Sequence, residues 1–357
     1  MKTDNQILKF ILRTKLFVII FFGSIMIFNY IVDPYGVLRS HQNRHRATGI
    51  NNHFVKIRHI LRNKDKYDSF VMGASTAAKI DVRKIKNGRY YSISYSLSVP
   101  YESLQDIKLL LKKGVKIKNI IMGLEDLSYK EDPLLHFKQY RRFPYTENIK
   151  KNTAYIFKNL FLIHDINYYI KTIVNKKYRK NGFEYSTVYD IENTGLVFAP
   201  GLDEYIEKDS VDYVKSEIFN KPRRLNRPQR IDKTIEEIKQ ICELAESENI
   251  HLVFYMSPIH HTTYMNINQK EFFLFKKKLA DVTDYYDFSG LNSITTNNFY
   301  FYETSHFRFC VGDWIINKLF GSGSAPEDFG VLVNKNNIAK HLAVQKEQLL
   351  NAGYVFE

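Results

Sequence analysis

Residues 68–76 read DSFVMGAST, and this stretch decides the fold. The run 70–72 is wholly apolar, which is typical of a strand buried on both faces of a parallel sheet. Gly73 and Ala74 permit a tight turn, and a helix is predicted to follow. Ligands of open parallel sheets bind at the carboxyl ends of strands. Two interpretations of Ser75 therefore stay open: a nucleophile at a helix N-terminus, whose free N–H groups can receive an oxyanion, or an ordinary helix N-cap.

Apolar runs and amphipathic stretches alternate on both sides of this segment. Further strands are predicted at residues 90–94, 119–124, 251–256 and 282–288. Helices are predicted near 53–62 and at 102–112, 232–248 and 311–320, from apolar residues spaced three or four apart. Strands separated by helices indicate an α/β fold with a parallel sheet, and right-handed crossovers place helices on both faces. We therefore predict a three-layer, doubly wound, mainly parallel sheet.

One long stretch interrupts this alternation. Residues 128–230 are rich in Tyr, Lys and Asn without a clean period, which predicts an inserted subdomain or lid. Residues 321–336 contain Gly, Ser, Pro and Asn and are interpreted as a linker, before a short helix at 338–350. The predicted organisation is an anchor at 1–36, the first part of the α/β domain at 37–127, the insertion at 128–230, the second part at 231–321 and a C-terminal tail at 322–357.

The most apolar stretch lies near the N-terminus. Residues 16–32, LFVIIFFGSIMIFNYIV, carry no charge, and about 17 residues is the short end of what spans a bilayer core. Four basic residues precede it, so the positive-inside tendency places the N-terminus in the cytoplasm. We predict a single-pass anchor in the inner (cytoplasmic) membrane with an extracytoplasmic, periplasmic domain. The alternatives are a buried core helix and a cleaved signal peptide, although no small-x-small cleavage site follows.

The charge balance is strongly basic. Among 357 residues, 52 Lys and Arg outweigh 38 Asp and Glu, a formal net charge of +14. Such a charge suits nucleic acid, anionic lipid headgroups or an acidic polymer. The anchor and the absence of zinc-finger, helix-turn-helix or RNP-like motifs argue against nucleic acid. The only cysteines, Cys242 and Cys310, fit neither a metal spacing nor a disulfide framework. No metal and no cofactor is predicted.

A second candidate motif stands just before the helix at 311–320. Residues 301–308 read FYETSHFR, so that Glu303 and His306 stand three positions apart on a predicted turn. The imidazole could take the proton of a nucleophile while the carboxylate holds its tautomer. A histidine beside aromatic residues is more often structural. Together with Ser75, however, the pair completes a Ser–His–acid set.

The order of these motifs resembles the SGNH/GDSL hydrolase superfamily. More narrowly, the chain looks like the membrane-anchored SGNH-like proteins of bacterial cell-surface polysaccharide modification, which include alginate acetylation proteins and the D-alanyl transfer protein of teichoic acid synthesis. The resemblance covers about residues 30–127 and 232–321 and rests on DPYG at 33–36, VMGAS at 71–75, DFSG at 287–290 and YETSH at 302–306. It implies an SGNH/flavodoxin-like fold, with Ser75 as nucleophile, His306 as general base and Glu303 where the family usually has Asp.

Two further blocks depart from the family's pattern. The second block usually supplies a Gly whose N–H completes the oxyanion hole, but residues 92–98 read SISYSLS, so Ser96 or a neighbour is the candidate donor. The third block usually reads Gly-x-Asn-Asp, whereas Gly123, a further candidate for the substrate or oxyanion site, is followed here by Leu, Glu125 and Asp. An ionised carboxylate cannot donate and would repel an oxyanion. Glu125 is therefore expected to point away or to have another role, leaving the hole to the Ser75 N–H and one or two other amides.

Other residues are candidates for substrate contact. His260 and His261 follow the strand at 251–256 on the same rim, and exposed loop histidines are the alternative. Arg308 could bind an anionic sugar or carboxylate, or be an ordinary surface arginine. Residues 140–142 and 176–180 interleave basic and aromatic side chains, which suits an acidic glycan, an anionic membrane surface or simply a solvated basic face.

The sequence thus supports two functions. The first is a membrane-anchored, extracytoplasmic serine esterase or O-acyltransferase, in which Ser75 attacks an acyl ester of an acidic cell-surface polysaccharide and water or a sugar hydroxyl resolves the acyl-enzyme. The second is a catalytically inactive SGNH-like protein that binds a glycan or partners a membrane-bound acyltransferase. The set Ser75, Glu303 and His306 favours the first, whereas Glu125 and the missing second-block Gly favour the second.

Overall fold

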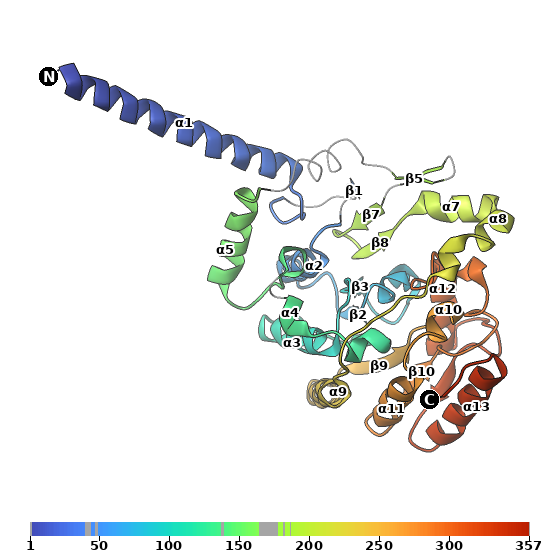
Figure 1. Ribbon diagram of the computed structural model, residues 1–357. Coiled ribbons are helices and arrows are strands. Elements are labelled where there is room, and N and C mark those ends of the chain that lie inside the picture. Colours follow the sequence, from blue (N-terminus) through green and yellow to red (C-terminus); the bar gives the residue numbers. More distant parts are fainter. Residues whose placement is uncertain are drawn as a thin grey trace.

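A six-stranded sheet forms the centre of the computed structural model, which describes residues 2–39, 44–46, 49–136, 139–163, 178–180, 183–185 and 187–356. The strand order is β11-β10-β9-β4-β2-β3 (Figure 1). Five strands are mutually parallel and one, β11, runs antiparallel at the edge. Their bounds are β2 (Ser69–Gly73), β3 (Tyr90–Ser92), β4 (Asn119–Leu124), β9 (His251–Met256), β10 (Tyr285–Asp287) and β11 (Val331–Val333).

The chain reverses its direction of travel across the sheet at β2. It adds β3 on one side of β2 and then crosses back through α3 (Pro100–Lys112) to add β4 on the other. The carboxyl ends of strands at such a switch point form the crevice where open α/β sheets bind ligands. The register pairs Gly73 with Gly123, so β2 and β4 end at the same level. Ser75 and Glu125 are thereby brought to the same edge.

The predicted α/β class with a mainly parallel sheet is confirmed. The strands predicted at 119–124 and 251–256 have the bounds of β4 and β9, whereas those predicted at 70–72, 90–94 and 282–288 differ from β2, β3 and β10 at their ends. The strand expected at 282–288 begins only at Tyr285, because the Val282 and Thr283 N–H groups bond to the Leu279 carbonyl and close the preceding helix. The helices that alternate with the strands are α2 (Asn52–Arg62), α3, α9 (Ile231–Ser247), α11 (Gln269–Ala280), α12 (Phe309–Phe320) and α13 (Ile338–Asn351).

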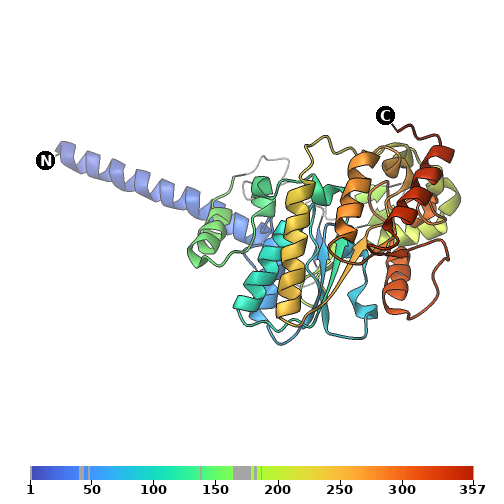
Figure 2. The ribbon, with the colours of Figure 1, turned by 90° about the horizontal axis from the view of Figure 1, so that it is seen from below.

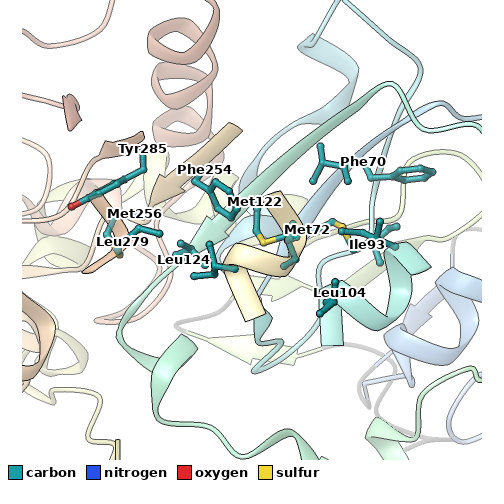
Figure 3. Close-up of a cluster of buried hydrophobic side chains, with 14 of the residues drawn as sticks. Phe70, Met72, Ile93, Leu104, Met122, Leu124, Phe254, Met256, Leu279 and Tyr285 are labelled. Atoms are coloured by element: carbon teal, nitrogen blue, oxygen red, sulfur yellow. The ribbon is translucent and has the colours of Figure 1, made fainter. Parts of the chain in front are cut away.

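Helices cover both faces of the sheet, and a hydrophobic core fills each side. Side chains alternate across a strand, so Phe70 and Met72 enter one core while Val71 enters the other. Figure 2 shows α3, α9 and α11 side by side along the first face. Figure 3 shows the strand side chains of this core, which include Met122 and Phe254, meeting those of the helices. The opposite core is closed by α12 and by short 3-10 helices.

The C-terminal residues belong to the sheet domain. Residues 321–336 were expected to be a linker. This was wrong for residues 331–333, which form β11 and pair with β10. α13 then packs beside α11. Its Gln345 accepts a hydrogen bond from Lys276 Nζ (2.8 Å), and His341 Nε2 lies 2.8 Å from Asp287 Oδ2. These contacts lock the C-terminal helix onto the end of β10.

Lys276 and Asp287 form a wholly buried ion pair, with Nζ and Oδ2 2.9 Å apart. Lys276→Met should lower the free energy of unfolding by about 3–5 kcal/mol, because it removes the buried ammonium group that pairs with the Asp287 carboxylate and leaves it only the contact with His341. Urea unfolding of the full chain in detergent measures this, with the exposed neighbour Lys277→Met as the matched control. Equal stability of the two variants would contradict the account.

The pair of Lys276 and Asp287 also makes the stability of the fold depend on pH. Burial alone would raise the pKa of Asp287, but the charges and hydrogen bonds of Lys276 and His341 outweigh it and hold that pKa well below its ordinary value. A carboxylate with a lowered folded-state pKa stabilises the fold above its unfolded pKa of about 3.9, and this stability is lost as the pH falls below it. The free energy that the Asp287 carboxylate contributes to the stability of the parent should therefore decrease on acidification below about pH 4, which urea unfolding at a series of pH values measures.

The N-terminal helix α1 (Lys2–Val32) projects away from the rest of the molecule (Figures 1 and 2). Its most apolar part lies within residues Asn5–Val32 and is long and apolar enough to cross a membrane. Only 6% of this apolar window is buried, so the alternative of a buried core helix was wrong. A turn follows α1 at residues 33–36, since the Gly36 N–H bonds to the Asp33 carbonyl.

The predicted insertion forms several small elements between β4 and β9. Two of its strands join a strand from the segment after α1 in a small antiparallel sheet of order β1-β7-β8. The elements of this region are β1 (Arg44–Arg46), α4 (Pro133–His136), α5 (Ile149–Leu160), β5 (Tyr178–Lys180), β6 (Phe183–Tyr185), β7 (Thr187–Asp190), β8 (Leu196–Phe198), α7 (Pro200–Lys208) and α8 (Ser210–Val214).

Candidate active site

Ser75 lies just beyond the end of β2, on a turn that only glycine at position 73 allows. Gly73 has φ +133°, and a Cβ there would lie 2.6 Å from the Gly123 carbonyl oxygen. The helix predicted after Ser75 is only the 3-10 helix η1 (Ala77–Lys79), so no α-helix dipole points at the serine. Within the described part of the chain, the Ser75 N–H donates no hydrogen bond. It is therefore free to donate to a ligand.

Glu303 and His306 come from a tight turn before α12. A bridge between Phe301 and Phe307 closes this turn, and the Tyr302 N–H donates to the His306 carbonyl (2.8 Å). Glu303 Oε1 is hydrogen-bonded to His306 Nδ1, and its Oε2 accepts from the Ser305 N–H (2.8 Å). Both carboxylate oxygens are thus fixed from within the turn.

The carboxyl of Glu303 stays ionised in this setting. Burial alone would raise the pKa of Glu303, but the hydrogen bond and charge of His306, with the bonds from Ser305, outweigh it and hold the pKa below its ordinary value. An ionised carboxylate can only accept, so the proton of this bond sits on His306 Nδ1. The other ring nitrogen, Nε2, is then left with its lone pair.

The structure brings together the three residues predicted to form a catalytic set. Ser75 Oγ lies 2.8 Å from His306 Nε2, although the two residues are 231 positions apart. The hydroxyl can give its proton to Nε2, and Glu303 stabilises the imidazolium that results. All three residues are half-buried, so the hydroxyl is shielded but reachable. The arrangement has the connectivity of a Ser–His–acid triad.

Glu125 has the other role that the sequence left open. Its side chain is 2% exposed. One oxygen, Oε1, accepts from Thr76 Oγ1 (3.0 Å), and the other, Oε2, accepts from Arg223 Nη1 (2.6 Å). Arg223 also pairs with Asp126. Glu125 is therefore a buried anion whose charge is compensated, and it holds the residue next to Ser75 in place.

The remaining oxyanion candidates lie close to the turn, with different roles. A Cβ at Gly123 would lie 2.6 Å from the Tyr255 hydroxyl oxygen, so this glycine is explained by packing. The loop after β3 runs beside the end of β2, since the Tyr95 N–H donates to the Gly73 carbonyl (3.3 Å). Ser96, the next residue, is exposed, and its carbonyl accepts from Arg142 Nη2 (2.5 Å).

Leu97 lies at the bend of this loop in an unusual backbone conformation. Its φ is +58°, a backbone conformation that a bulky side chain rarely adopts. Such strain persists only where the surroundings impose it, and it is concentrated at functional sites. Leu97 packs against the cluster formed by Ala74, Val99 and Leu127, which adjoins Ser75. The loop beside Ser75 is therefore bent at Leu97.

His260 is not available for substrate contact, so this expectation was wrong. The side chain is fully buried, and its Nε2 lies 2.8 Å from Asn298 Oδ1. Its Nδ1 accepts the Thr262 N–H at the start of α10 (His261–Tyr264). Burial lowers the pKa of His260 to about 4, so the ring is neutral. It is a structural cap and not part of the rim. His261 is half-buried beside it.

Arg308 is not an anion site either. Its side chain is 3% exposed and pairs with Asp203 (3.2 Å) and Glu207 (2.9 Å) of α7, while Nη1 donates to the Phe299 carbonyl (3.3 Å). The guanidinium carbon also lies 4.7 Å from the centre of the Phe299 ring. Arg308 therefore ties the insertion to the start of α12.

Contacts from the insertion, which were not predicted, support the turn that carries Glu303 and His306. The Tyr213 hydroxyl contacts the carbonyls of Phe301 and Tyr302 (2.9 and 2.8 Å). The Tyr302 hydroxyl in turn donates to Asp203 (2.7 Å). Lys79 lies over the Tyr302 ring, 4.7 Å from its centre, and burial lowers the pKa of Lys79 to about 8. No local spacing in the sequence reveals such long-range contacts.

The two basic and aromatic stretches of the insertion lie apart from this turn in the sequence. Residues Tyr140–Arg142 form the 3-10 helix η4, whose Arg142 donates to the Ser96 carbonyl. Of the second stretch, residues 178–180 form β5, and residues 176 and 177 lie outside the described residues. Among the described residues, no group of three or more His, Cys, Asp or Glu side chains could hold a metal ion.

No protein-family model matches the chain, and no curated protein matches its sequence.

Proposed function

We propose that the protein is a membrane-anchored, extracytoplasmic, SGNH-like serine esterase or O-acyltransferase that acts on a cell-surface polysaccharide. One observation carries the proposal: the hydrogen-bonded chain from Ser75 Oγ through the His306 ring to Glu303. The serine follows the first strand of the parallel sheet and the histidine precedes α12, which is the motif order of the SGNH/GDSL superfamily. The apolar, projecting α1 supports the anchor.

The geometry supports a two-step acyl transfer. Ser75 Oγ attacks the ester carbonyl carbon while His306 Nε2 takes the hydroxyl proton, and the free Ser75 N–H donates to the developing oxyanion. The C–O bond to the leaving alcohol breaks as His306 returns the proton to that oxygen. Water or a sugar hydroxyl then attacks the acyl-enzyme, loses its proton to His306, and releases Ser75 with the proton restored.

The charge and one cavity support a polymeric, acidic substrate. A cavity of about 770 Å³ lies at the edge of the sheet where α3 and α9 begin. Its lining includes Tyr101 and four cationic side chains, which outnumber the three carboxylates there: Lys130, Arg227, Arg230 and Lys233 against Asp132, Asp232 and Glu237. Tyr101 also packs against the cluster that contains Ala74, the neighbour of Ser75. Aromatic and basic side chains suit a sugar ring and its acidic groups. We place the non-reacting part of the polysaccharide here.

Glu125 favours a second candidate function, a catalytically inactive SGNH-like protein that binds a glycan or partners a membrane-bound acyltransferase. The side-chain donor that the family has at this position is missing, and losing one oxyanion donor typically costs about 10²–10³ in turnover. The ion pair with Arg223 offsets the repulsion that Glu125 would otherwise exert, which leaves room for a slow enzyme.

Trapping of the acyl group separates the two functions. The full chain in detergent is mixed with p-nitrophenyl acetate, quenched in acid and digested, and the peptide that contains Ser75 should gain the mass of one acetyl group. Added acidic polysaccharide should shorten the life of this acyl-enzyme more than a neutral polysaccharide does. Absence of acetylation at Ser75 in folded protein, together with retained glycan binding, would favour the inactive candidate.

A further inference from the structure

The helix α5 presents two opposite faces. Asn152, Tyr155 and Asn159 are buried and attach it to the domain, as in the bond from the Tyr155 hydroxyl to the Tyr140 carbonyl (2.6 Å). The other face and the residues that follow expose large apolar side chains. The exposed fractions are 71% for Ile149, 56% for Phe157, 43% for Phe161 and 69% for Ile163. A helix with exposed apolar side chains opposite its buried face is expected to contact an apolar environment outside the domain, such as a membrane.

The C-terminal end of α5 lies against α1. Asn29, in the apolar stretch of α1, is fully buried, and its Nδ2 donates to the carbonyls of Leu160 (2.9 Å) and Leu162 (2.8 Å). The rings of Phe22 and Phe161 meet edge to face with their centres 6.4 Å apart. Figures 1 and 2 both show α5 beside the part of α1 that is nearer to the domain.

The contact between Phe161 and Phe22 determines how deep Phe161 lies in the bilayer when α1 spans it. Phe22 precedes Val32, the last residue of α1, by ten positions, which is about 15 Å along a helix. The hydrocarbon core of a bilayer is about 30 Å thick. When α1 spans the membrane, Phe161 therefore lies inside the hydrocarbon of the leaflet nearer to the domain, and not above its surface.

The polar groups at this end of α5 are arranged for a site without water. The last carbonyls of a helix lack partners within it, and in hydrocarbon each unpaired group costs several kcal/mol. Asn29 supplies donors for two carbonyls here. The lysines of α5, Lys150, Lys151 and Lys158, are exposed, and their flexible stems can carry the ammonium groups to the lipid phosphates.

We propose that residues 157–163, the C-terminal part of α5 and its continuation, are a second membrane contact that enters the same leaflet as the C-terminal half of α1. The inference rests on the anchoring role of α1 in the proposed function. Contact at two points prevents the domain from rotating freely about α1. The edge of the sheet that carries Ser75 is thereby held in a fixed orientation toward the membrane.

Quenching by brominated lipids tests this contact. The full chain is reconstituted into phosphatidylcholine–phosphatidylglycerol vesicles with brominated acyl chains, and Phe161→Trp and Ile163→Trp are each compared with the parent, whose single Trp314 gives the background. The added fluorescence of both variants should be largely lost. Ile163→Trp leaves the contact between Phe22 and Phe161 unchanged, so the test survives if Phe161→Trp disturbs folding.

Two controls separate this inference from the anchoring proposal. Phe17→Trp, 68% exposed on α1, should be quenched, whereas Leu350→Trp, 51% exposed on α13 at the far end of the molecule from α1, should not be. Quenching of Phe17→Trp without quenching of Phe161→Trp or Ile163→Trp would contradict the second membrane contact but agree with membrane anchoring by α1. This outcome with a blue-shifted emission at 161 would mean that a protein partner covers the face. No quenching at 17 would overturn both.

Discussion

Replacement of His306 by alanine should lower the rate of ester hydrolysis by a factor on the order of 10⁴–10⁶. Ser75 then loses the base that contacts its hydroxyl, His306 Nε2. The initial rate of p-nitrophenyl acetate hydrolysis by the full chain in detergent measures the effect. His251→Ala is the matched control. His251 is exposed and begins β9, so it lies at the amino ends of the strands, whereas Ser75 lies at their carboxyl ends. Parent-like turnover in His306→Ala would exclude the triad.

Glu303→Gln should reduce the same rate by a factor of about 10⁴, although it changes only one atom. The Ser305 N–H donates to Glu303 Oε2 and would select the amide oxygen of the glutamine. The NH₂ group would then face His306 Nδ1 and donate to it, which moves the ring proton to Nε2. His306 could no longer accept the proton of Ser75. An unchanged rate would show that Glu303 does not set the tautomer.

Arg223→Met should lower the free energy of unfolding by about 3–5 kcal/mol. The side chains of Glu125 and Asp126 are each 2% exposed, and Arg223 pairs with both. Burial raises the pKa of Asp126 even with Arg223 present, so removal of Arg223 leaves two buried, neighbouring carboxylates without the guanidinium group that pairs with both. Urea unfolding of the full chain measures the loss.

Arg224→Met is the control for this variant, because Arg224 is the next residue and is exposed. Adding Glu125→Gln to Arg223→Met should restore part of the lost stability, since it removes one of the two unpaired charges. If Arg223→Met were as stable as Arg224→Met, the compensation of Glu125 by Arg223 would be wrong. The explanation for a carboxylate beside the proposed oxyanion site would then fail as well.

The fold class could be read from the sequence because its strands are short, apolar and buried on both faces. Residues 70–72 and 119–124 have no exposed side chain, and their mainly apolar composition is what predicts this burial. The strand at residues 331–333 was not predicted, because its side chains are mostly exposed. β11 is an antiparallel edge strand of three residues in which Val331 and Leu332 are exposed, and its neighbours Gly330 and Asn334 suggest only a loop.

The candidate site could be predicted only where local spacing carries the information. Glu303 and His306 are three residues apart on one turn, and Ser75 ends a central strand, so topology alone brings them to one edge. The role of Glu125 depends on Arg223, which lies 98 residues away in the insertion. The burial of His260 and Arg308 likewise depends on tertiary packing that neither residue's neighbours reveal.

Labelling with a fluorophosphonate probe tests the central claim most directly, because the probe reacts only with a serine that an adjacent base activates. The full chain in detergent is incubated with the probe beside Ser75→Ala, and folding of both is checked by their unfolding curves. The account predicts labelling of the parent at Ser75 and none in Ser75→Ala. Absence of labelling in folded parent protein, or equal labelling of both, would contradict it.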